Sequence, residues 1–285
     1  MSMTVATIDQ TLVETVERRW SLEALTRHEP ALASVGLLML AIMPPTLFAM
    51  LVDARTIQGV NVWMKPFKFE MALAVYVLTL VFFARYLSEG VRQRRWYRVY
   101  IGAVIAAIVL EVVWIGGAAA IGTSSHFNRT PIGDIIYSAM GAAAVLLTSA
   151  SAVFAWQIAR NRQTTLAPAL KESVVIGLAL VLPFTLLTAG TMSSMSSHFV
   201  GGSGAGVGGF PLMGWARDRG DLRVSHFFAT HAMHFVPAFG LLSVAMFGGD
   251  ERRPVRLFAL AFVILVGFTF MQALAGNPFL PSIGG

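Results

Sequence analysis

The chain has 285 residues, of which 56% are hydrophobic and only 13% charged. Soluble domains carry about 25% charged residues, so this composition excludes a soluble globular protein. The formal charge is +6 at pH 7, but the 21 Lys and Arg residues flank apolar segments rather than forming a basic domain, so we expect no nucleic-acid partner. The chain has no cysteine, which excludes disulfides, iron–sulfur clusters and thiolate-ligated haem.

Residues 1–30 are polar overall, with Val5, Ile8, Leu12, Val16 and Trp20 at steps of three and four. This spacing predicts an amphipathic helix on the cytoplasmic membrane interface. Seven apolar segments follow, each close to the length of about 20 residues that crosses a hydrocarbon core. They are 31–52, 69–87, 99–122, 135–159, 173–192, 225–247 and 257–275. The predicted fold is all-α, a seven-helix transmembrane domain over residues 31–285.

Lys and Arg alternate in abundance from loop to loop. Fourteen precede the first span or lie in the loops after the second, fourth and sixth, and seven lie in the loops after the first, third and fifth. Basic residues are enriched in cytoplasmic loops. We therefore expect a cytoplasmic N-terminus and an extracytoplasmic C-terminus.

Histidines gather on the side expected to be extracytoplasmic. Five of the six lie there: His126, His198, His226, His231 and His234. The last three fall on one broad face of the sixth span, because a helix turns by 100° per residue. We expect at least three of His126, His198, His226 and His231 to converge on one site, although a single histidine near an interface can simply hydrogen-bond a neighbour.

Carboxylates and arginines accompany these histidines. Glu111 lies midway through the third span, Glu70 near the outer end of the second, and Asp221 directly before the sixth. Ionisable groups inside a membrane are costly and usually mark a functional site. We expect Glu111, Glu70 and Asp221 to be catalytic or proton-transfer groups, and Arg129 and Arg223 to bind a cofactor.

This combination of side chains leaves several chemistries open. Imidazole and carboxylate groups bind zinc, iron or copper, and pairs of imidazoles also ligate haem b. The first prediction is a metal-dependent enzyme or haem b redox protein that acts on a lipid-soluble or extracytoplasmic substrate. The alternative is a transporter or sensor in which Glu111 and the histidines bind protons or a cation without chemistry. Expected partners are membrane lipids and a lipophilic small molecule; the sequence leaves the oligomeric state open.

The loop at residues 193–224 is unusually long and has six glycines between positions 201 and 209. Long loops in compact folds are usually functional or disordered. The loop is therefore either a lid over the outer site or a flexible connector.

Three segments resemble a widespread family of bacterial multi-pass membrane proteins of unknown activity. They are Asn61–Phe69, Ser125–Pro131 and Gly220–Arg223 with the following His226 and His231. The resemblance covers most of the chain through its outer segments. It implies a location in the bacterial cytoplasmic membrane and carries no activity with it.

Overall fold

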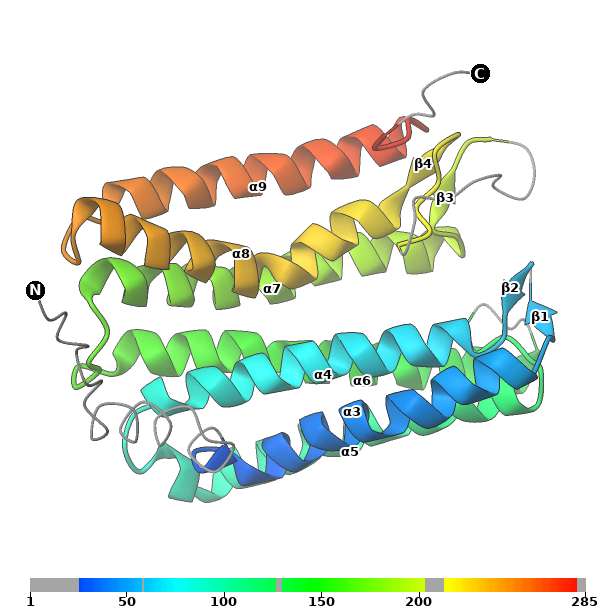
Figure 1. The fold of residues 1–285 in the computed structure, drawn as a ribbon, viewed down its shortest axis with the longest axis horizontal. Coiled ribbons are helices and arrows are strands. Elements are labelled where there is room, and N and C mark those ends of the chain that lie inside the picture. Colours follow the sequence, from blue (N-terminus) through cyan, green and yellow to red (C-terminus); the bar gives the residue numbers. More distant parts are fainter. Residues whose placement is uncertain (1–25, 58, 127–129, 203–212, 281–285) are drawn as a thin grey trace, which may run out of the picture.

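The structure, a computed structural model, describes residues 26–57, 59–126, 130–202 and 213–280. Its seven long helices run antiparallel in two layers (Figure 1). One layer contains α3 (Pro30–Val52), α4 (Met64–Phe83), α5 (Arg95–Ala120) and α6 (Pro131–Arg160). The other contains α7 (Pro168–Met195), α8 (Leu222–Phe247) and α9 (Arg253–Leu274). Two short 3-10 helices, η1 (Ala84–Tyr86) and η2 (Val91–Gln93), connect α4 to α5.

The seven predicted spans are confirmed, since all seven helices are long and apolar enough to cross a membrane. Their starts lie one to five positions before the predicted ones; α4 begins at Met64 rather than at residue 69, and α7 at Pro168 rather than at residue 173. Helices extend beyond the apolar stretch because polar residues continue the backbone hydrogen bonding into the interface. The predicted amphipathic helix in residues 1–25 and most of the glycine-rich loop lie outside the described residues.

Two small hairpins mark one end of the bundle, which we call the strand end (Figure 1). Strands β1 (Thr56–Ile57) and β2 (Val60–Asn61) pair antiparallel between α3 and α4. Strands β3 (Phe199–Val200) and β4 (Gly220–Asp221) pair between α7 and α8, with Phe199 opposite Asp221. The opposite end, which we call the arginine end, carries the loops that are rich in arginine.

Asp53 organises the first hairpin at the strand end. Its carboxylate accepts hydrogen bonds from Arg55 and from the Trp63 indole, the latter at 2.8 Å. Arg55 in turn donates to the Ala120 carbonyl at the end of α5. These bonds hold the ends of α3, α4 and α5 together, and they keep the pKa of the Asp53 carboxyl well below its usual range.

The core lies between the helices, and the outer surface is also apolar. Phe154, Ile108 and Met233 are fully buried, whereas Phe48 and Leu257 are mostly exposed. Apolar side chains on both faces are expected where lipid replaces water. Helices α7 and α8 pack closest, because a Cβ atom on Gly240 would overlap the Ser173 side chain. Small residues permit such close contact between membrane helices.

Candidate functional site

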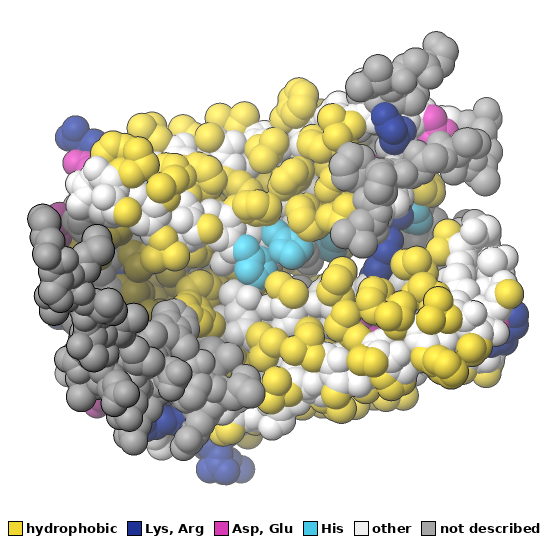
Figure 2. All heavy atoms as spheres, in the orientation of Figure 1, with side chains coloured by type: hydrophobic (Ala, Val, Ile, Leu, Met, Phe, Trp, Pro, Cys, Tyr) yellow, Lys and Arg dark blue, Asp and Glu magenta, His cyan; other side chains and the backbone are white. Residues whose placement is uncertain are grey.

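The candidate site lies in a groove between the two helix layers. Figure 2 shows this hollow, in which histidine side chains gather midway and Lys or Arg side chains lie toward the strand end. The histidines of the spans all belong to α8, and each is half-buried: His226, His231 and His234. We call these three residues the α8 histidines.

A hydrogen bond across the groove connects α4 to α8. Thr79 Oγ1 of α4 lies 2.9 Å from His234 Nε2 of α8. The same hydroxyl donates its hydrogen to the Val75 carbonyl at 2.7 Å. A hydroxyl has one hydrogen and two lone pairs, so Thr79 must accept from His234. His234 therefore carries its proton on Nε2.

The position of this proton also determines which nitrogen of the neighbouring His231 is protonated. His231 Nδ1 and His234 Nδ1 lie 3.1 Å apart. In a neutral imidazole one nitrogen donates and the other accepts, so His234 Nδ1 accepts and His231 Nδ1 donates. The lone pair of His231 is then on Nε2, where a bound molecule can use it.

His226 also hydrogen-bonds a threonine of another helix, and it lies more than one turn of α8 closer to the strand end than His231. Its Nδ1 lies 2.9 Å from Thr188 Oγ1 on α7. Thr188 donates its hydrogen to the Phe184 carbonyl at 2.8 Å, so His226 Nδ1 carries the proton. Two of the α8 histidines, His226 and His231, thus present a basic Nε2.

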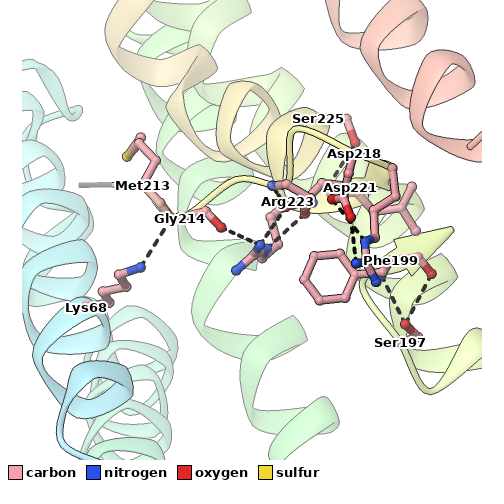
Figure 3. A network of polar contacts seen from close by, with 12 residues as sticks. Lys68, Ser197, Phe199, Met213, Gly214, Asp218, Asp221, Arg223 and Ser225 are labelled. Carbon is pink, nitrogen blue, oxygen red and sulfur yellow. Dashed lines mark hydrogen bonds and ion pairs between the residues drawn. The ribbon is translucent and has the colours of Figure 1, made fainter. Parts of the chain in front are cut away.

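A polar network closes the groove at the strand end (Figure 3). Asp221 is only 1% exposed and forms an ion pair with Arg223. Its carboxylate also accepts from the backbone N–H groups of Ala216 and Arg223, so it caps the start of α8. Across the groove, Lys68 of α4 donates to the Met213 carbonyl at 3.2 Å. We call Lys68, Asp221 and Arg223 with these backbone groups the Arg223 network.

The second hairpin fixes the position of this network. The Phe199 ring of β3 lies 5.0 Å from the Arg223 guanidinium carbon, a cation–π contact. The Leu222 N–H donates to the His198 carbonyl at 2.9 Å. Gly220 is required here, because a Cβ atom would overlap the Ala273 carbonyl of α9.

Lys65 interacts with a second group of side chains, which come from separate parts of the chain. It interacts electrostatically with Glu111 of α5, with His126 after α5 and with His198 before β3. Glu111 is buried, as its position midway through a span predicts. We call these four residues the Lys65 cluster. His198 and Lys68 both interact electrostatically with Arg223, so the cluster and the Arg223 network are neighbours.

The two loop histidines of the Lys65 cluster are neutral at pH 7. Burial lowers the pKa of His126 from 6.5 to about 4, and the nearby Lys65 cation contributes. Burial likewise lowers the pKa of His198 to about 4, with a contribution from Arg223. The Tyr137 ring packs edge-on against His126. At neutral pH neither histidine therefore adds a charge to the cluster.

The structure does not unite all of the residues expected from sequence. Glu70 turns toward α3, where it accepts a hydrogen bond from Thr46 at 2.7 Å. Arg129 lies outside the described residues. In the described ranges, no three His, Asp or Glu side chains are placed to hold a metal ion, so the expected convergence of three histidines on one ion is not found there.

Lys65 and Lys68 are site residues that the sequence pattern does not predict, because it places them in a loop, where their charge serves as a topology signal. Both lie in the first turns of α4, since this helix begins at Met64. The chain has only one other lysine, Lys171. The available signal was that two of the three lysines of the chain stand three positions apart, directly before the same apolar span.

Comparison of the chain with protein-family models, curated proteins and solved structures gives no match. This result is consistent with the resemblance to a family of unknown activity. The function must therefore be inferred from the site alone.

Proposed function

We propose that the protein takes up an anionic, lipid-soluble molecule in the groove and exchanges protons with it. The observation that carries this proposal is that two half-buried ammonium groups, those of Lys65 and Lys68, lack a carboxylate partner at ion-pair distance. Neither Lys65 nor Lys68 forms an ion pair in the described part of the chain. Buried charges are normally paired, so these two groups favour an anionic partner that is not part of the protein.

The charges around the lysines agree with an anionic ligand. The Asp221 carboxylate accepts two hydrogen bonds from the Arg223 guanidinium, at 2.8 Å and 2.5 Å, so its charge is already balanced by Arg223 rather than by a lysine. Glu111 is the carboxyl group of the Lys65 cluster and interacts electrostatically with Lys65. Lys65, Lys68 and Arg223 thus contribute three cationic groups to this end of the groove, against the two carboxyl groups of Asp221 and Glu111. A cation would be repelled by this arrangement, whereas a carboxylate or phosphate would be attracted.

The depth of the groove supports a ligand with an apolar body. The α8 histidines lie farther from the strand end than Arg223, because they follow it along the helix. Phe227 packs against His231, with ring centroids 4.3 Å apart, and Phe228 and Phe235 lie beside it. A head group at the lysines would thus place an apolar chain beside aromatic rings and near the Nε2 atoms of His226 and His231. These atoms and the Glu111 carboxyl are the groups we assign to proton exchange.

Binding tests this function directly. We expect purified protein in nanodiscs to bind decanoate more tightly than the uncharged decanol. Lys65→Met and Lys68→Met should remove this preference, whereas Lys171→Met should keep it, because Lys171 donates to the Asn161 carbonyl at the arginine end. Equal binding of decanoate and decanol by the wild type would overturn the proposal.

Proton exchange is tested separately by calorimetry in buffers that differ in ionisation enthalpy. Decanoate binding should be accompanied by proton uptake or release, and His226→Gln with His231→Gln should reduce it. Unchanged proton exchange in this double variant would remove the α8 histidines from the proposed role. Assays of reconstituted vesicles then separate proton-coupled transport from acid–base catalysis.

The orientation of the site rests on loop charge. We propose that the strand end is extracytoplasmic in a bacterial cytoplasmic membrane, because fourteen of the 21 basic residues precede the first span in the sequence or belong to the loops after the second, fourth and sixth spans. A reporter inserted at Gly90 should read as cytoplasmic, and one fused after Gly285 as extracytoplasmic. The reverse pair of readings would place the site on the cytoplasmic side.

One observation favours a second candidate, a transition-metal site. Two Nδ1 atoms 3.1 Å apart, in His231 and His234, can also bind one ion with bonds of about 2 Å. The Thr79 hydroxyl would then orient His234 through its Nε2–H, as outer groups do for metal ligands. Zinc, iron or copper fits imidazole. Haem b, with two of His126, His198, His226 and His231 as its ligands, is a further proposal.

Elemental analysis and absorption spectra of oxidised and reduced protein test this candidate. His231→Ala with His234→Ala should remove bound metal or haem, and His28→Ala should leave it in place. Protein that is purified from metal-supplemented medium without metal or haem would rule the candidate out.

A further inference from the structure

A second pocket lies at the arginine end, far along the bundle from the groove. Its volume is about 390 Å³, and it is lined by residues from the α4–α5 connection, the start of α5 and the end of α6. The polar and aromatic residues of its lining include Glu89, Arg94, Trp96, Trp156, Gln157 and Arg160. Nothing in the proposed function employs this pocket.

The charge of the pocket favours an anion. Arg94 and Arg160 are exposed and form no ion pair in the described residues. Arg95 and Arg98 add two cations in the first turn of α5, which has no acidic residue. A helix N-terminus carries a partial positive charge, so cations there are unfavourable unless an anion compensates them. Glu89 is the only carboxylate among the lining residues.

The side chain of Gln157 provides a second, independent indication. Gln157 is only 7% exposed and lines the pocket. Its side-chain amide forms no hydrogen bond to any residue that the structure describes and is not among the fully enclosed unpaired atoms there, so it is available to a molecule in the pocket. An amide N–H beside two guanidinium groups is the donor set that binds phosphate oxygens.

Two tryptophans place the pocket at the level of lipid head groups. Trp96 lies in the first turn of α5, and Trp156 lies in the last turns of α6. Trp156 is 48% exposed and stacks under the Arg160 guanidinium, whose carbon is 4.7 Å from the ring centroid. Tryptophan is enriched at the membrane–water interface, where its ring is partly apolar and its N–H is polar.

We propose that this pocket binds the phosphate head group of an anionic phospholipid, with Arg94, Arg160 and Gln157 on the phosphate oxygens and the two tryptophans against the glycerol and upper acyl chains. Basic pockets between membrane helices are known to favour such lipids. The ligand chemistry is a phosphate diester, and the head group rather than free phosphate is the proposed source. The site is independent of the groove, so it stands or fails separately from the proposed function.

Binding to lipids of defined charge tests the proposal. Full-length protein is placed in mixed micelles with phosphatidylglycerol or phosphatidylcholine, and its thermal unfolding midpoint is followed against lipid concentration. Wild-type protein should be stabilised selectively by phosphatidylglycerol. Arg94→Gln with Arg160→Gln should weaken this effect by about tenfold or more, since each lost charge-assisted bond contributes strongly.

A control variant removes two arginine charges at the same end of the bundle but outside the pocket. Arg162→Gln with Arg253→Gln lies at the arginine end but outside the pocket lining, and it should retain the wild-type lipid response. An equal loss in this control would reduce the effect to general charge attraction and overturn the site. Stabilisation by inorganic phosphate alone to the same extent would overturn the assignment to a lipid.

A conservative variant covers the case in which the double Gln variant does not fold. Arg94→Lys with Arg160→Lys keeps both charges but removes the planar guanidinium groups that bind phosphate through two parallel bonds. Its affinity for phosphatidylglycerol should be lower than that of wild type. Unchanged affinity would contradict the proposal.

Discussion

Thr79 and His234 form the hydrogen bond that joins the two helix layers across the groove, with Oγ1 and Nε2 2.9 Å apart. Because the Thr79 hydrogen is already bound to the Val75 carbonyl, this bond determines which nitrogen of His234 carries the proton. The same logic continues to His231, whose Nε2 is left as a base. The hydroxyl of Thr79 on α4 thus determines which ring nitrogen is protonated in both His234 and His231 on α8.

Removing this hydroxyl should destabilise the protein. Thr79→Val keeps the shape of the side chain but leaves the His234 Nε2–H without an acceptor, which costs about 1–3 kcal/mol. The measurement is the midpoint of thermal unfolding in a fixed detergent. Thr191→Val is the matched control, because Thr191 is a helical residue whose hydroxyl donates only to its own helix, at Leu187. Equal midpoints for the two variants would show that the bond across the groove contributes nothing.

Asp221 should be the most sensitive carboxylate at the strand end. Asp221→Asn removes a 1% exposed charge and leaves Arg223 without its counterion, and breaking a buried pair typically costs about 3–5 kcal/mol. The comparison is Asp218→Asn, whose carboxylate pairs with Arg219 but is 44% exposed. Unfolding by increasing SDS should show a large loss for Asp221→Asn and a small one for Asp218→Asn. A similar loss for both would contradict the central position given to Asp221.

Acid should destabilise the folded protein through its loop histidines. The pKa of both His126 and His198 is about 4 in the fold and near 6.5 when exposed. Between these values the unfolded chain binds more protons, so stability is fully present above pH 6.5 and falls as the pH is lowered toward 4. His198→Gln should make the thermal midpoint less sensitive to pH over this range. An unchanged pH profile would show that His198 is not buried in the neutral form.

The fold was largely predictable from the sequence, because membrane thickness sets the length of an apolar helix. The common face of the α8 histidines was predictable for a similar reason, since it depends only on helix geometry. The exact start of α4 was not, because Met64 and Lys65 lie beyond the apolar stretch. Because α4 begins five positions earlier than predicted, Lys65 and Lys68 lie on the helix, in the candidate site, rather than in a loop.

The contacts of the site depend on tertiary packing that no local pattern encodes. The sequence predicts that His126 and His198 meet at a metal, whereas in the structure both interact electrostatically with Lys65. The ion pair of Asp221 with Arg223 is local, whereas its position depends on the pairing of β3 with β4 and on the approach of α9 to Gly220. Hydrogen-bond partners such as Thr79 and Thr188 come from other helices.

The central claim is that an anionic, lipid-soluble molecule occupies the groove between α4 and α8. Its most direct test is photolabelling of the protein in membranes with a diazirine-bearing fatty acid, followed by mass spectrometric mapping of the modified residues. We expect labelled positions to concentrate on the facing sides of α4 and α8, and Lys68→Met to remove the label while Lys171→Met retains it. Labelling confined to exposed lipid-facing residues such as Phe48 or Leu257, and unaffected by Lys68→Met, would contradict the account.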